Sequence, residues 1–148
     1  MTDRDRKIRI IVSWIPVIFV MGLIFWFSSQ YSVESAQTSF GLLQFIEKLF
    51  NITFDHALLR KLAHAFEYFV LSITVFFAMH ITFGKIKPVS TLVLTTLYGL
   101  TDEIHQIFVP GRACMAFDVF VDMCGATAGV IVCAVLSWLL GLRMRAKK

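Results

Sequence analysis

Two long apolar runs constrain the fold of this chain more than any other feature of its sequence. Residues 10–27 contain no charged side chain, and residues 119–142 contain only Asp122. A helix built from either run is long enough to cross a hydrocarbon layer of roughly 30 Å. The composition agrees, since 57% of the 148 residues are hydrophobic and 16% are charged, which is too apolar for a soluble domain of this length. The sequence therefore predicts an integral membrane protein.

Two further apolar segments raise the expected number of membrane spans to four. The predicted spans are 8–28, 58–83, 89–109 and 118–142. The expected fold is all-α: a polytopic bundle of four transmembrane helices that forms a single domain over residues 1–148. Apolar side chains also recur at helical spacing in residues 42–50, opposite polar ones, which predicts a short amphipathic helix on the membrane surface between the first two spans.

The basic residues indicate how such a bundle would be oriented. They precede the first span, separate the second from the third and follow the fourth: Arg4, Arg6, Lys7, Arg9, Lys85, Lys87, Arg143, Arg145, Lys147 and Lys148. With four spans, all of these positions fall on one side, and loops rich in Lys and Arg stay in the cytoplasm. We therefore expect a multi-pass protein with both termini cytoplasmic. The net charge of +4 is then a topology signal, and no nucleic-acid partner is expected.

A polar block interrupts the apolar pattern where the third span ends and the fourth begins. Its members are Asp102, Glu103, His105, Gln106, Arg112, Asp118 and Asp122. Ionisable groups in membrane segments are expensive, so they mark functional sites by default. Helical spacing places Tyr98, Asp102, His105 and Gln106 on one face. Glu103 points about 100° away from that face and is expected to have a different partner.

The second predicted span carries a matching set of polar side chains. Arg60, His64, Glu67 and Tyr68 stand at positions i, i+4, i+7 and i+8, which gathers them on one broad face near the outer end of that helix. With the polar block, these residues place functional groups at the outer ends of three helices. One outward-facing site explains this arrangement, and the first span is expected to contribute nothing chemical to it.

The residue types suggest roles within such a site. His64 and His105 would move protons, with Glu67 and Asp102 orienting and charging them, so these four are the candidate catalytic residues. Guanidinium groups bind anionic headgroups well, and carboxylate and amide groups would complete the shell around the ligand. The candidate ligand-binding residues are Arg60, Tyr68, Glu103, Gln106, Arg112, Asp118 and Asp122.

Three alternatives stay open from the residues alone. In the first, the protein is a non-enzymatic lipid- or antibiotic-binding protein or an accessory subunit, and its polar groups form a structural network of salt bridges and hydrogen bonds that clamps the bundle. Imidazole and carboxylate groups would also suit a divalent metal such as zinc or manganese, although their spacing matches no recognised metal motif. In addition, the small residues around Gly125-x-x-x-Gly129 form a close-packing surface that would allow an oligomer.

Three motifs together resemble those of a known family. They are Phe27-Ser28-Ser29-Gln30, Arg60-Lys61-x-x-His64-x-x-Glu67-Tyr68, and Asp102-Glu103-x-His105-Gln106-x-Phe108-x-Pro110-Gly111-Arg112 followed by Asp118-Val119-x-x-Asp122-x-x-Gly125. This pattern is similar to that of the VanZ-like family of small bacterial membrane proteins, named for a protein that gives low-level resistance to the glycopeptide teicoplanin. The resemblance implies a cell-envelope role in the bacterial cytoplasmic membrane. Membrane lipids, a lipid-linked wall precursor or a glycopeptide are the expected ligands, and whether the chain is an enzyme stays open.

Overall fold

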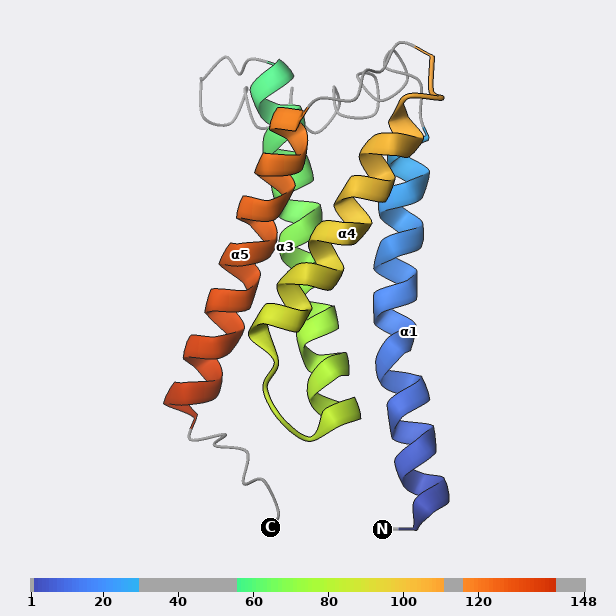
Figure 1. The fold of residues 1–148 in the computed structure, drawn as a ribbon, viewed down its shortest axis with the longest axis vertical. Coiled ribbons are helices and arrows are strands. Elements are labelled where there is room, and N and C mark those ends of the chain that lie inside the picture. Colours follow the sequence, from blue (N-terminus) through green and yellow to red (C-terminus); the bar gives the residue numbers. More distant parts are fainter. Residues whose placement is uncertain (1, 30–55, 111–115, 141–148) are drawn as a thin grey trace, which may run out of the picture.

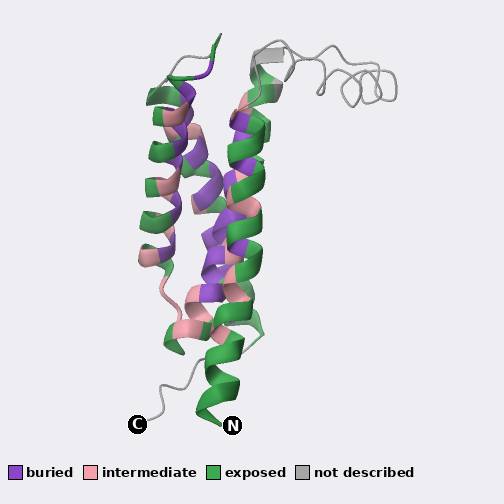
Figure 2. Cartoon of the chain, turned by 90° about the vertical axis from the view of Figure 1, so that its right-hand side faces the viewer, coloured by how far each residue is buried: buried purple, intermediate pink, exposed green. Residues whose placement is uncertain are grey.

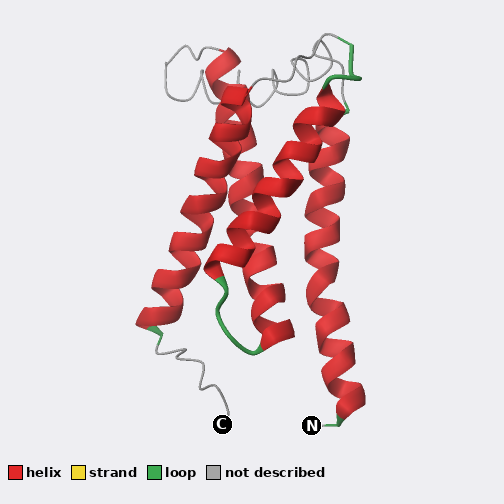
Figure 3. Cartoon of the chain, in the orientation of Figure 1, coloured by secondary structure: helices red, strands yellow, loops and turns green. Residues whose placement is uncertain are grey.

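Four long helices make up the described part of the chain, in a computed structural model that describes residues 2–29, 56–110 and 116–140. The helices are α1 Asp3–Ser28, α3 His56–Phe83, α4 Pro88–Gln106 and α5 Ala116–Leu139. Figures 1 and 3 show them side by side along the long axis of the molecule, with no strand among the described residues. The all-α prediction is confirmed. The predicted amphipathic helix at 42–50 lies outside the described residues.

Three of the four predicted spans are long and apolar enough to cross a membrane. They are α1, residues Arg60–Phe83 of α3, and α5. The fourth helix, α4, does not reach that apolar threshold, so a bundle of four spans stays a prediction. Yet α4 exposes apolar side chains like its neighbours, among them Val93, Leu97 and Ile104. This is the surface expected of a helix whose outer face meets lipid.

Local signals explain where the helices begin and end. Thr2 and Asp5 form a capping box, in which each side chain accepts a hydrogen bond from the other's backbone N–H, so α1 begins five residues before the predicted span. Gly84 ends α3 with a positive φ of 66°, a conformation that glycine adopts without steric cost. Pro88 then opens α4, because the first turn needs no backbone N–H donor.

The closest helix pair is α3 with α5, and two glycines make it possible. A Cβ atom added at Gly125 would overlap the Ala65 carbonyl group, and one added at Gly129 would lie 2.6 Å from the Phe69 carbonyl oxygen. The close-packing surface predicted from the sequence is therefore real. Its partner among the described residues is α3 of the same chain, and an oligomer through these glycines stays a prediction.

The buried core follows this contact and extends to α1. Figure 2 shows buried residues along the inner faces of the helices and exposed residues along their outer faces. Tyr68, Leu71 and Ala126 are at most 1% exposed and pack with Ile24 of α1. The outer faces remain strongly apolar, as lipid contact requires.

The ends of the bundle differ in chemistry. Figure 1 places the start of α1, the α3–α4 turn and the end of α5 at one end of the molecule. The basic residues Arg4, Lys85 and Lys87 belong to this end. The opposite end collects the end of α1, the start of α3, the end of α4 and the start of α5. Most of the predicted site residues belong to that second end.

Candidate functional site

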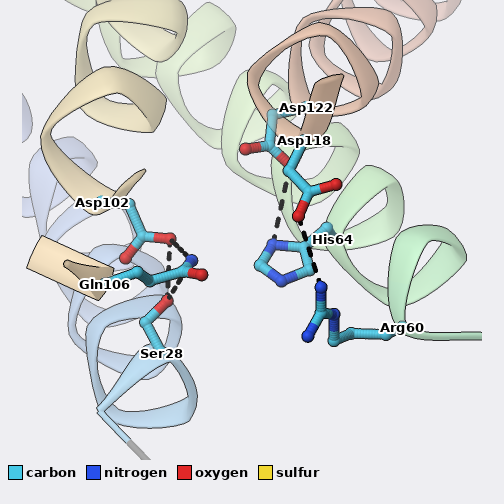
Figure 4. Close-up of polar contacts among 7 residues, drawn as sticks. All are labelled: Ser28, Arg60, His64, Asp102, Gln106, Asp118 and Asp122. Atoms are coloured by element: carbon cyan, nitrogen blue, oxygen red, sulfur yellow. Dashed lines mark hydrogen bonds and ion pairs between the residues drawn. The ribbon is translucent and has the colours of Figure 1, made fainter. Parts of the chain in front are cut away.

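The first polar cluster joins α1 to α4 and consists of Ser28, Asp102 and Gln106. The Ser28 hydroxyl donates to Asp102 Oδ2 over 2.7 Å, and the Gln106 amide donates to the same oxygen over 3.1 Å (Figure 4). Gln106 Nε2 also lies 3.4 Å from Ser28 Oγ, which closes the triangle. All three side chains are at most 3% exposed. We call this group the α1–α4 cluster; its bonds fix one helix end against the other.

The rest of the predicted α4 face also points at α1. The Tyr98 hydroxyl donates to the Met21 carbonyl oxygen over 2.7 Å. His105 packs edge-on against the Phe25 ring, with centroids 4.3 Å apart, and its Nε2 lies 3.5 Å from the Ser29 hydroxyl. The shared face predicted for α4 is therefore confirmed. Its partner is α1, so the expectation that the first span contributes nothing chemical is wrong.

The second polar cluster joins α3 to α5. Arg60 Nη2 lies 3.5 Å from Asp118 Oδ2, and His64 Nδ1 lies 3.7 Å from Asp122 Oδ1 (Figure 4). The side chains of His64, Asp118 and Asp122 are at most 8% exposed, whereas that of Arg60 is 42% exposed. We call these four residues the α3–α5 cluster. The cluster therefore combines a half-exposed guanidinium with a buried imidazole and two buried carboxyl groups.

The pairings follow from helix geometry. Arg60 and His64 stand one turn apart on α3, and Asp118 and Asp122 stand one turn apart on α5, so two parallel pairs form across the interface. Close contact at Gly125, the next turn of α5, brings the two backbones together just below these pairs. The sequence predicted the α3 face and grouped it with polar residues of both following helices, without distinguishing which of them it contacts.

Tyr68 and the two glutamates lie between the clusters. The Tyr68 ring is fully buried against Gly99 of α4 and interacts electrostatically with both Asp102 and Asp122. Glu103 is 1% exposed and is the charged neighbour with the strongest influence on Asp122. Both groups are carboxylates, so this interaction is a repulsion, and the different partner predicted for Glu103 stays a prediction. Glu67, which is partly exposed, interacts with Tyr68 as well.

Two sequence-based hypotheses, an anion-binding role for Arg112 and a metal site, find no support among the described residues. Arg112, predicted to hold an anionic group, lies outside the described residues. Across the described ranges, no three His, Cys, Asp or Glu side chains come together in an arrangement that could hold a metal ion. The described residues therefore do not fit the metal alternative.

Ser28 is the residue that sequence reasoning missed. Its only signal was its position at the polar exit of an apolar helix, in the Phe27-Ser28-Ser29 motif. A serine at the end of a span is ordinary, because a single hydroxyl is easily solvated there. Only the packing of α1 beside α4 shows that this hydroxyl is buried and bonded to Asp102.

The α1–α4 cluster should behave as an energetic unit. Ser28→Ala and Asp102→Ala should each destabilise the fold, by about 1–3 kcal/mol, because each removes the buried hydrogen bond between the Ser28 hydroxyl and the Asp102 carboxylate. The double variant should be less destabilised than the sum of the two by about 1 kcal/mol, because the lost bond is shared. Unfolding of the purified variants in detergent measures all three. Strict additivity would contradict a direct Ser28–Asp102 bond.

The comparisons with known proteins agree with the motif resemblance. Comparison with curated proteins and with solved structures gave no match. The VanZ/LLP1 family, by contrast, matches residues 13–137. This match includes α3, α4 and α5 up to Ser137, and it contains every residue of both clusters. With three helices long and apolar enough to cross a membrane and a family match over most of its length, the chain belongs to the VanZ/LLP1 family.

Proposed function

We propose that this protein binds the headgroup of an anionic envelope lipid or lipid-linked wall precursor in the α3–α5 cluster, from the outer face of the cytoplasmic membrane. One observation carries the proposal. Arg60 is 42% exposed beside a carboxylate, Asp118, that is 3% exposed, at the end of the bundle opposite the basic residues. A cation that is half in solvent and half in the protein is placed to draw a phosphate from the membrane surface toward buried polar groups.

The remaining residues of the cluster could supply acid–base chemistry. His64 lies 3.7 Å from Asp122, and a histidine beside a carboxylate is the usual general acid or base of a protein site. Modification of the bound headgroup would therefore run through His64, with Asp122 orienting it. In this proposal the glycopeptide expected from the family resemblance is a further candidate for the same site.

The second candidate function is structural, and the α1–α4 cluster favours it. Ser28, Asp102 and Gln106 bond one another, and all are buried. Such a closed group ties α1 to α4 without any ligand. We therefore assign Asp102 and Gln106 to positioning α4, and we place ligand contact in the α3–α5 cluster.

Lipid retention tests this assignment. We expect the purified protein to carry one tightly held phospholipid or isoprenoid phosphate in native mass spectrometry, and Arg60→Ala or His64→Ala to lose it. His105→Ala should retain it, because His105 packs on Phe25 and Ser29 of α1. Lys7→Ala is the matched control, since Lys7 forms an exposed ion pair at the other end. Equal retention by all four variants would overturn the proposal.

The outward orientation has its own test. In a chain whose three cysteines are replaced by alanine, an impermeant thiol reagent applied to intact cells should label Pro110→Cys and leave Lys85→Cys unlabelled. Pro110 is exposed near the polar end, and Lys85 is exposed in the turn at the basic end. The expectation follows from the retention of positive loops in the cytoplasm. The opposite labelling pattern would invert the topology and place the site inside the cell.

A further inference from the structure

Among the described residues, buried oxygen atoms in the α3–α5 cluster have no hydrogen-bond donor. Asp118 and Asp122 are each 2% exposed. Asp118 Oδ1 and both carboxylate oxygens of Asp122 have no hydrogen-bond partner among the described residues. An ionised carboxylate only accepts hydrogen bonds, and an acceptor left without a donor in a buried place costs about 1–3 kcal/mol. These oxygens therefore call for a donor.

Tyr68 on α3 also carries a buried polar atom without a hydrogen-bond partner among the described residues. This atom is the hydroxyl oxygen, and the Tyr68 side chain is 0% exposed. Its ring lies against Gly99 of α4, and it interacts electrostatically with Asp122 and Asp102. Buried tyrosine hydroxyls ordinarily find a partner. Buried polar atoms without a partner among the described residues therefore occur on α3 as well as on α5.

The carboxylates of the α3–α5 cluster determine which kind of hydrogen-bond donor would bind there. Arg60 Nη2 approaches Asp118 through Oδ2, which leaves Oδ1 of that residue unbonded. Figure 4 shows Asp118 and Asp122 on the same side of α5, turned toward Arg60 and His64. Two carboxylates one helical turn apart favour a cation, and a primary ammonium brings three N–H donors with its charge. A quaternary ammonium brings the charge and no donor.

We propose that the lipid bound here carries a primary ammonium beside its phosphate, as a phosphoethanolamine headgroup does, with the ammonium between Asp118 and Asp122 and the phosphate on Arg60. This inference rests on the proposed lipid-binding function and narrows it to a zwitterionic headgroup. The two carbon atoms that separate phosphate from ammonium let one headgroup reach both the half-exposed guanidinium and the buried carboxylates.

Defined lipids test the inference with the full-length protein in detergent. Phosphatidylethanolamine, phosphatidylcholine and phosphatidylglycerol of identical chains are titrated while the thermal midpoint is followed, because a ligand that binds only the folded state raises it. We expect at least about tenfold tighter binding of the ethanolamine lipid, which one charge-assisted hydrogen bond supplies. Asp122→Asn should abolish that preference. Asp3→Asn, which alters an exposed carboxylate at the other end, should keep it.

Each other result has a definite meaning. Equal affinity for the three lipids, all of it lost in Arg60→Ala, would overturn the ammonium site and leave the lipid-binding function intact. No affinity for any lipid would overturn both. Free phosphoethanolamine is added as a further arm; if it binds as tightly as the lipid, the assignment of the ligand to the membrane is wrong. Unchanged preference in Asp122→Asn would also overturn the ammonium site.

Discussion

Alanine at Gly125 is expected to destabilise the bundle by about 3 kcal/mol, the upper end of the range for overpacking a close contact. The added methyl group would overlap the carbonyl group of Ala65, which belongs to the α3 backbone. A backbone cannot turn away as a flexible side chain can, so α3 and α5 must separate. That separation would also part Arg60 from Asp118 and His64 from Asp122. Thermal unfolding in detergent measures the loss.

Gly22 provides the matched control on α1. No atom lies within 4 Å of a Cβ added there, and Gly22 also stands inside an apolar helix. Gly22→Ala should therefore be neutral or stabilising by up to about 1 kcal/mol, because alanine has the higher helix propensity. If Gly125→Ala were as well tolerated as Gly22→Ala, the close α3–α5 contact would be refuted.

Reversing the charge of Arg60 should have the second-largest effect. Arg60→Asp places a carboxylate beside Asp118, a residue that is 2% exposed, and removes its only cationic partner in the described ranges. We expect a loss of about 2 kcal/mol, below the range for fully buried pairs because Arg60 is half exposed. Adding Asp118→Asn removes the repulsion and should restore most of the thermal midpoint.

A shorter ion pair at the other end of the molecule makes the comparison sharp. Lys7 and Asp3 are 2.9 Å apart, closer than Arg60 and Asp118, but their side chains are more than 70% exposed. Lys7→Asp should change stability by less than about 1 kcal/mol, because water screens both groups. Similar losses from Lys7→Asp and Arg60→Asp would show that burial does not set the strength of the Arg60–Asp118 pair.

The sequence predicts the helices of this protein well because long apolar runs have few alternatives in lipid. The uncharged run at 10–27 became α1, and the run from 119 became α5. The helix ends were less predictable. The Thr2–Asp5 capping box extended α1 outward, and α4 ended at Gln106 although its apolar pattern continued to Val109. Helix ends depend on a few local capping hydrogen bonds, and the spacing of apolar residues does not reveal these bonds.

The sequence predicted which candidate residues share a helix face, but it did not predict which neighbouring helix each face packs against. Helical spacing correctly grouped Asp102 with Gln106, and Arg60 with His64. Which helix each face meets depends on the order of helices around the bundle, and the position of Gly125 against Ala65 sets the α3–α5 contact. For this reason the sequence suggested one site, whereas the structure contains two clusters with Tyr68 between them.

One paired measurement tests the division of the polar end most directly: unfolding stability and lipid affinity determined on the same samples of Asp102→Asn and Asp122→Asn. The division predicts that Asp102→Asn lowers stability and leaves the dissociation constant for phosphatidylethanolamine unchanged, since Asp102 bonds only Ser28 and Gln106 among the described residues. Asp122→Asn should weaken that affinity at least about tenfold. Loss of lipid affinity in Asp102→Asn, with full affinity in Asp122→Asn, would contradict the account.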